Sequence, residues 1–85
     1  MQVSGVAKVA KTADGKIVLE VAGRPAFELN HVALRIWTKL EAGQSPEEIS
    51  SQIASEFKAP GETATRDVTR FIKKLKDNLL LYEDS

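Results

Sequence analysis

The sequence predicts an α+β domain in which a three-stranded antiparallel sheet precedes three helices, in the order β-β-β-α-α-α. Up to Leu29, apolar residues tend to alternate with polar ones, and an Asp14-Gly15 pair separates two such runs. After Asn30, apolar residues recur at the three- and four-residue spacing of a helix. A strand-rich part followed by a helix-rich part is typical of α+β domains, in which helices cover one face of the sheet.

Three short segments in the first part of the chain are predicted strands. Residues 3–11 show a weakly amphipathic period-two pattern, and residues 16–21 are rich in β-branched side chains. Asp14 and Gly15 tolerate the positive φ angles of a tight hairpin turn between these strands. The third strand covers residues 25–29, where the initial proline lacks a backbone donor and therefore suits a strand start or an edge strand.

The first two helices are predicted from their caps. Asn30 is a favoured N-cap for a helix over about residues 31–42, and Gly43 is the expected stop. Ser45 caps the second helix, with a proline at its first position and Glu48 three residues after the cap, which is a capping box. Two helices joined by so short a turn resemble a helix-turn-helix, so the expected domain is winged helix-turn-helix-like.

The third helix and the end of the chain follow a break at residues 59–61. This helix is expected to begin at about residue 62 or 63 and to run to about residue 77. Asn78 can adopt the left-handed conformation at its end, and residues 79–81 can then fold back on the core. Residues 82–85 are expected to form a frayed tail.

Apolar stripes at helical spacing predict the core. The second-helix stripe includes Phe57, and Trp37 lies on the first-helix stripe, which favours a core residue over an exposed ligand platform. His31 has no nucleophile at a diagnostic spacing, so a surface or cap role is expected. Glu47 and Glu48 are explained by the positive end of the second helix. The expected core residues are Leu29, Ile36, Trp37, Ile49, Ile72, Leu75 and Leu79.

Length and composition limit the classes of function. The 85 residues are expected to form a single domain over residues 1–85. The chain has no cysteine and a single histidine, which predicts no metal site and no cofactor held by thiolates or imidazoles. No apolar run is long enough to cross a membrane, and no secretory signal is present, so a cytoplasmic location is expected. No nucleophile, metal set or phosphate loop indicates an enzyme.

Basic residues gather on the third helix, where Arg66, Arg70 and Lys74 accompany Lys73 and Lys76. A solvated helix face or a surface for an anionic partner explains this pattern equally well. Binding of DNA by a winged helix is therefore the alternative function. It is disfavoured because the formal net charge is zero and because acidic residues in the first two turns would repel phosphate.

An edge of the small sheet is the other candidate surface. Edge strands expose unpaired N–H and C=O groups, which can pair with an added peptide strand. If the third strand lies beside the third helix, Phe27, Val68 and Phe71 would offer apolar pockets, and Arg70 and Lys74 would meet carboxylates. The same edge would also permit two copies of the chain to pair as a dimer.

An ordered series of residues resembles the PqqD family of peptide chaperones, also called RiPP recognition elements. The series covers about residues 14–81: Phe27-x-Leu29-Asn30, Ile36-Trp37, Gly43-x-Ser45-x-Glu47-Glu48-Ile49, Asp67-Val68-x-x-Phe71-Ile72-x-x-Leu75 and Leu79-Leu80. The family often has Gly before the final Leu-Leu, where this chain has Asn78. Members bind the leader segment of a ribosomally made precursor peptide, and some serve lasso-peptide clusters.

The resemblance implies a non-catalytic domain that adds the leader as a strand to the third strand, in the groove against the third helix. It implies no cofactor. The implied partners are the precursor peptide and a modifying enzyme such as a leader peptidase, a cyclase or a radical enzyme. Carried onto this sequence, the peptide-binding residues are Arg24, Pro25, Ala26, Phe27, Glu28, Arg66, Asp67, Val68, Arg70, Phe71 and Lys74.

Overall fold

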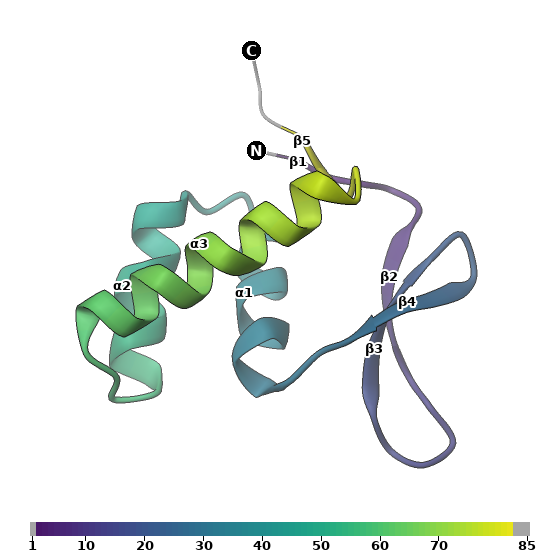
Figure 1. The fold of residues 1–85 in the computed structure, drawn as a ribbon, viewed down its shortest axis with the longest axis horizontal. Helices are drawn as coiled ribbons and strands as arrows, with labels where there is room; N and C mark the ends of the chain where they lie inside the picture. Colours follow the sequence, from purple (N-terminus) through teal and green to yellow (C-terminus); the bar gives the residue numbers. More distant parts are fainter. Residues whose placement is uncertain (1, 83–85) are drawn as a thin grey trace.

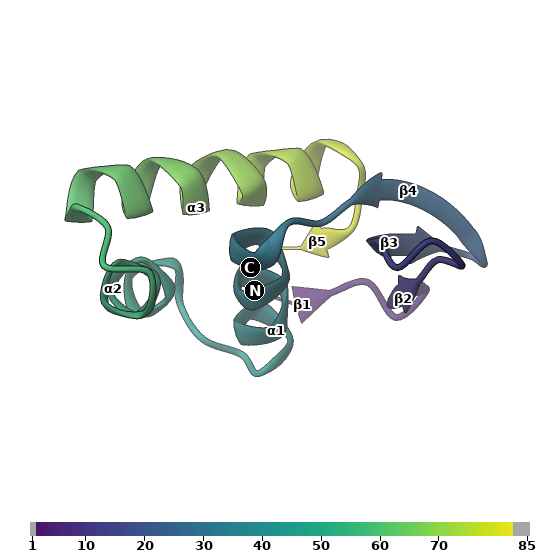
Figure 2. The same ribbon diagram turned by 90° about the horizontal axis from the view of Figure 1, so that it is seen from below.

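The computed structural model describes residues 2–82 and has the predicted sheet followed by three helices, so the α+β class is confirmed. The sheet projects to one side of the helices, and a second pair of short strands joins the two ends of the chain (Figures 1 and 2). In chain order the elements are β1 (Gln2–Val3), β2 (Ala7–Lys11), β3 (Ile17–Val21), β4 (Arg24–Glu28), α1 (His31–Glu41), α2 (Pro46–Glu56), α3 (Gly61–Asp77) and β5 (Leu81–Tyr82).

The antiparallel sheet has the strand order β2-β3-β4, so β4 lies at an edge, as the sequence predicts. Gly15 closes the first hairpin with a φ of 88°, a left-handed value that glycine adopts without strain. The register of β3 and β4 contains a β-bulge, because Phe27 and Pro25 pair with consecutive residues of β3. Ala26 between them therefore has no partner, which bends the edge strand locally.

The expectation of a single strand over residues 3–11 is wrong. The chain turns between β1 and β2, where Ser4 is buried and its backbone N–H donates to the carbonyl oxygen of Leu80 at 2.8 Å. β1 pairs antiparallel with β5, which places Gln2 opposite Tyr82. Tyr82 therefore belongs to a strand rather than to a frayed tail, and residues 83–85 lie outside the described part of the chain.

The predicted helix caps are confirmed. The side-chain oxygen of Asn30 accepts a hydrogen bond from the Ala33 backbone N–H at 2.8 Å at the start of α1. At α2, the hydroxyl of Ser45 accepts from the Glu48 N–H, and the Glu48 carboxylate accepts from the Ser45 N–H, which completes the capping box. Helix α3 begins at Gly61, slightly earlier than expected, and its N-cap has no side-chain hydrogen bond.

The turn after α3 differs from the prediction in one residue. Asn78 has a φ of −101°, and the left-handed conformation falls on Leu79, whose φ is 59°. The Asn78 side chain instead donates to the Lys74 carbonyl oxygen at 2.7 Å. Leu79 is 70% exposed, so its predicted core role is wrong, whereas Leu80 and Leu81 are buried as expected.

A single hydrophobic core joins all three helices to β3, β5 and the start of β2. Trp37 is fully buried at its centre, which confirms the expected core role. Phe57 is 38% exposed at the end of α2, so it lies at the margin of the predicted apolar stripe. The largest of the fully buried side chains are Trp37, Leu19, Ile36, Ile49, Ile53, Leu75 and Val68.

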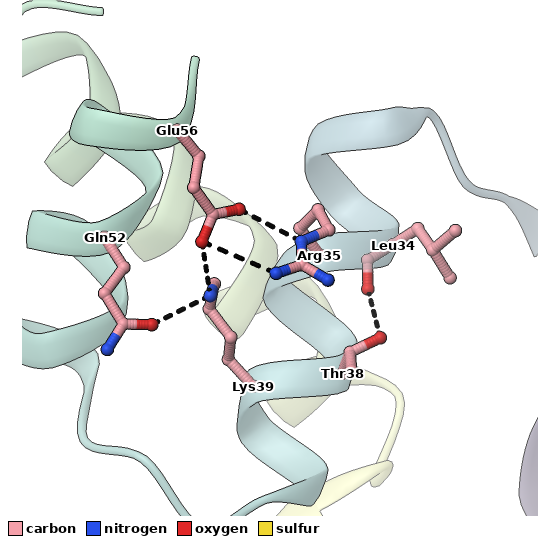
Figure 3. A network of polar contacts seen from close by, with 6 residues as sticks. All are labelled: Leu34, Arg35, Thr38, Lys39, Gln52 and Glu56. Carbon is pink, nitrogen blue, oxygen red and sulfur yellow. Dashed lines mark hydrogen bonds and ion pairs between the residues drawn. The ribbon is translucent and has the colours of Figure 1, made fainter. Parts of the chain in front are cut away.

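A polar cluster fixes α1 against α2 (Figure 3). The ammonium of the buried Lys39 lies 2.6 Å from one Glu56 carboxylate oxygen and donates to the Gln52 side-chain oxygen at 2.8 Å. Arg35 donates to the other Glu56 oxygen at 3.0 Å. These two cations hold the pKa of Glu56 down at about 2, mainly through hydrogen bonds, and the same carboxylate raises the pKa of Arg35.

Candidate functional site

A cleft of about 330 Å³ opens between the end of β4, the start of α1 and the outer face of α3. The end of β4 lies near the C-terminal half of α3, where Lys74 contacts the Phe27 ring (Figure 2). The cleft exists because β4 leads directly into α1, so the edge strand and the first helical turn share one wall. Its lining residues are Phe27, Glu28, Asn30, Val32, Ala33, Ile36, Asp67, Arg70, Phe71 and Lys74.

The floor of the cleft is apolar. Phe27 from β4, Val32 and Ala33 from α1, and Phe71 from α3 are partly buried and pack against the main core. Each of these side chains is therefore anchored on one side by the core and faces the cleft on the other. Such a surface suits apolar side chains of a ligand, because their burial would remove further apolar area from water.

The wall formed by α3 is charged. Asp67, Arg70 and Lys74 fall at the three- and four-residue spacing that places helical side chains on one face. The Lys74 ammonium lies 4.7 Å from the centre of the Phe27 ring, within the range of a cation–π contact. This contact joins α3 to β4 across the cleft.

The free edge of β4 borders the same cleft. The Leu29 N–H donates to the Ile17 carbonyl oxygen at 2.8 Å, so the backbone groups of Leu29 face β3. Because neighbouring residues of a strand alternate in direction, those of Glu28 face away from the sheet. The Glu28 carboxylate lies 3.9 Å from Lys16, so its side chain belongs to the exposed face of the sheet. Glu28 therefore contributes an open N–H and C=O to the cleft.

The predicted site residues divide into three groups. The structure brings Phe27, Glu28, Asp67, Arg70, Phe71 and Lys74 together in the cleft. Arg24, Pro25 and Ala26 are exposed on the earlier part of β4, and Arg66 is exposed on α3 outside the lining. Val68 is 1% exposed and belongs to the core, so its side chain is not available as a cleft pocket.

Sequence reasoning missed the contribution of α1. Asn30, Val32, Ala33 and Ile36 line the cleft, although the apolar members of this group carry the spacing of an ordinary core stripe. The available signal is the absence of a linker between β4 and α1. An edge strand that ends two residues before a helix must place the first helical turn beside its own open edge.

Other hollows lack this combination of features. A larger one, of about 500 Å³, lies between α2 and α3 and is lined mainly by small and hydroxyl-bearing side chains such as Ser50 and Thr65. A third, of about 420 Å³, lies over β2 and β3 near Val6. Neither adjoins the open edge of β4, so the cleft between β4 and α3 is the stronger candidate for a binding site.

The side chains considered as catalytic groups lie in the first turns of helices. His31 is exposed at the first position of α1, and Glu47 and Glu48 lie in the first turn of α2. Over residues 2–82, no group of three or more His, Cys, Asp or Glu side chains is arranged to hold a metal ion. Within the same range, none of the helices has the length and apolar character that crossing a membrane requires.

The fold and the cleft define a small α+β module with an open strand edge beside a helix. The sequence model of the family described as Coenzyme PQQ synthesis protein D (PqqD) matches residues 15–81. The chain therefore belongs to the PqqD family. No protein of curated function matches it.

Two solved structures share the fold over almost the whole chain. One is TbiB1 in complex with the TbiA(beta) leader peptide, with 34% identity, coverage of 99% of this chain and 100% of that chain, and a TM-score of 0.78. The other is lasso peptide synthetase B1 complexed with the leader peptide, with 28% identity, coverage of 96% of each chain and a TM-score of 0.76. Neither the family nor these two structures indicates a DNA-binding protein.

Proposed function

We propose that this protein binds the leader segment of a ribosomally made precursor peptide as an added antiparallel strand on β4, in the cleft against α3. The observation that carries the proposal is the open edge of β4 beside a cleft with an apolar floor. Backbone pairing to the edge supplies affinity that is independent of sequence, and the floor selects the side chains that are seated. The leader-peptide complexes of the two similar proteins support this ligand class.

The protein carries out no chemistry in this proposal. It holds the leader and presents the rest of the precursor to a separate modifying enzyme, such as a leader peptidase, a cyclase or a radical enzyme. We place this step in the cytoplasm, where ribosomes release the precursor. The peptide-binding residues are those of β4 and α3 that line the cleft, together with the first turn of α1.

Chemical-shift mapping tests the site. Isotope-labelled protein is titrated with the leader of a candidate precursor peptide, and the largest amide shifts are expected at residues 24–30 and 65–75. Shifts that cluster instead around Ser50 and Ser51 of α2, in the hollow between α2 and α3, would refute the β4 site. Light scattering during the titration separates leader binding from pairing of two β4 edges in a dimer.

Strand addition itself is tested at Glu28, whose N–H faces away from the sheet. Glu28→Pro removes that donor, and its loss is expected to weaken leader binding about tenfold, as for one hydrogen bond at the strong end of the usual range. Glu28→Ala, which keeps the N–H, is the matched control and should bind normally. Thermal melts followed by the fluorescence of Trp37, the single tryptophan, report whether each variant is folded.

Leaders carrying one N-methylated residue test the same point without changing the protein. Methylation should weaken binding at alternate positions of the leader, because only every second residue of an added strand directs its backbone groups to β4. Equal sensitivity at consecutive positions would argue against strand pairing.

A further inference from the structure

The charged side chains on the cleft face of α3 follow a fixed order, with the acidic one nearer the N-terminus of the helix and the basic ones nearer its C-terminus. Asp67 is followed one turn later by Arg70 and another turn later by Lys74. Within residues 2–82, neither Asp67 nor Arg70 forms an ion pair or a side-chain hydrogen bond. The Lys74 ammonium lies over the Phe27 ring, and no ion pair of Lys74 is found within the described residues 2–82. These charges are thus available to a ligand in the cleft.

The direction of a bound strand follows from the arrangement of β4 and α3. The two elements run in opposite directions (Figure 2), and the contact between Phe27 and Lys74 places the end of β4 beside the C-terminal half of the helix. A strand added antiparallel to β4 therefore runs in the same direction as α3. Its earlier residues lie beside Asp67, and its later residues lie beside Lys74.

The spacing of the charges limits the spacing in the ligand. Lys74 lies seven positions after Asp67, which corresponds to about 10 Å along the helix axis. A strand advances about 3.3 Å per residue, so this distance spans roughly three strand residues. Because side chains on one face of a strand occur at every second position, the two ligand residues beside these groups are two or four positions apart.

We propose that the cleft selects peptides by charge order as well as by apolar content. The preferred segment carries a basic side chain beside Asp67 and, two or four positions later, an acidic side chain beside Arg70 and Lys74. Where these two residues are four positions apart, the side chain midway between them is on the same face of the strand and is an apolar one seated over Phe71. This inference rests on the proposed function, because strand addition to β4 sets the direction in which the peptide is read.

Selection from a displayed library of random peptides of about twelve residues tests the inference directly. Peptides enriched on the wild-type protein should place basic residues before acidic ones at the stated spacing. A variant with reversed polarity, Asp67→Lys combined with Arg70→Gln and Lys74→Glu, should enrich the opposite order. Arg66→Glu, an exposed change on α3 outside the cleft lining, is the matched control and should leave the order unchanged.

The binding affinity is then measured for one enriched peptide and for a copy of it in which the charged residues are exchanged. The wild type should prefer the first about fivefold or more, and the reversed variant should prefer the second, because exposed ion pairs each contribute a few-fold in affinity. The preference should shrink at high salt, which screens such pairs.

Two outcomes separate this inference from the proposed function. If enriched peptides shift the Glu28 amide but show no charge order, or keep the same order on the reversed variant, the charge inference is overturned and leader binding at β4 stands. If enriched peptides leave the Glu28 amide unshifted, both are overturned.

Discussion

Phe71 lies at the boundary between the core and the cleft. A comparison with Val68 on the same helix shows how sharp this boundary is. Phe71 is partly exposed and lines the cleft, whereas Val68, one turn earlier, is 1% exposed and does not. Both are apolar and both fall on the helical stripe, so spacing alone assigns them the same role. Burial separates a residue that stabilises the fold from one that also meets a ligand.

Phe71→Ala is expected to reduce leader affinity about tenfold, because it removes part of the apolar floor. It should lower the free energy of unfolding by roughly 2 kcal/mol, less than the 3–5 kcal/mol typical of a fully buried phenylalanine. Urea unfolding followed by Trp37 fluorescence measures stability, and calorimetric titration with the leader measures affinity.

Val68→Ala is the control for that experiment. Its side chain is in the core, so roughly 2 kcal/mol of stability should be lost while the folded protein binds the leader with unchanged affinity. An equal loss of affinity in both variants would mean that Phe71 acts only through the fold.

At the scale of elements, the helices could be predicted and the sheet only in part. Asn30, Ser45 and Glu48 act on groups at most three residues away, so their side-chain caps are encoded locally. The break between β1 and β2 has no such signal. It depends on β5, nearly eighty residues later, which pairs with Gln2 and Val3. The alternation of residues 3–11 indicated the strand at residues 7–11 correctly, but neither the turn at residues 4–6 nor the pairing of β1 with β5.

The polar cluster between α1 and α2 is also a contact between elements that no local pattern revealed. Arg35 and Lys39 both lie on α1, one turn apart, and both reach the single carboxylate of Glu56 on α2. The distance along the chain between α1 and Glu56 means that no local sequence pattern predicts this pairing. Lysine side chains are also seldom buried, so the burial of Lys39 is not expected either. Its consequence is an acid-sensitive link between two helices.

The folded protein should lose stability in acid, because the Glu56 carboxylate becomes protonated there. The ordinary pKa of a glutamate, 4.5, applies in the unfolded chain, and the cations lower it to about 2 in the folded protein. The stabilising contribution is therefore fully present above the unfolded value and is lost as the pH falls from about 4.5 towards 2. Urea unfolding of wild type and Glu56→Gln across this range should show the difference between them narrowing as the pH falls.

Glu41→Gln is the control for the acid experiment. Glu41 is exposed on α1 and forms no ion pair within residues 2–82, so its replacement should leave the pH dependence of the wild type unchanged. A stability difference between wild type and Glu56→Gln that stays constant from neutral pH to acid would contradict a role for the Glu56 carboxylate.

The whole molecule combines a packed body with a small sheet whose β4 edge is open. The core joins the helices to the strands, and β1 with β5 ties the beginning of the described chain to its end. The sheet projects from this body, which leaves β4 open beside α3 (Figure 2). The sequence predicted β4 and α3 as the walls of the site from the edge strand and the family resemblance. It did not predict that α1 supplies part of the apolar floor, because that requires the angle between β4 and α1.

The packing of the two chain ends against each other is tested at Leu80, which follows α3. Leu80 is 2% exposed and its carbonyl oxygen accepts the Ser4 N–H, so Leu80→Ala should lower the free energy of unfolding by roughly 3 kcal/mol through loss of packing where the chain ends meet. Urea unfolding measures this loss.

Leu79, the residue before it, is exposed and held at a φ of 59°, which is strained for any residue with a Cβ. Leu79→Gly should therefore raise the free energy of unfolding by roughly 0.5 kcal/mol, after the entropy of glycine in the unfolded chain is subtracted. Leu79→Ala keeps the strain and should show no gain, so equal unfolding midpoints for the glycine and alanine variants would rule out a strained turn at this position.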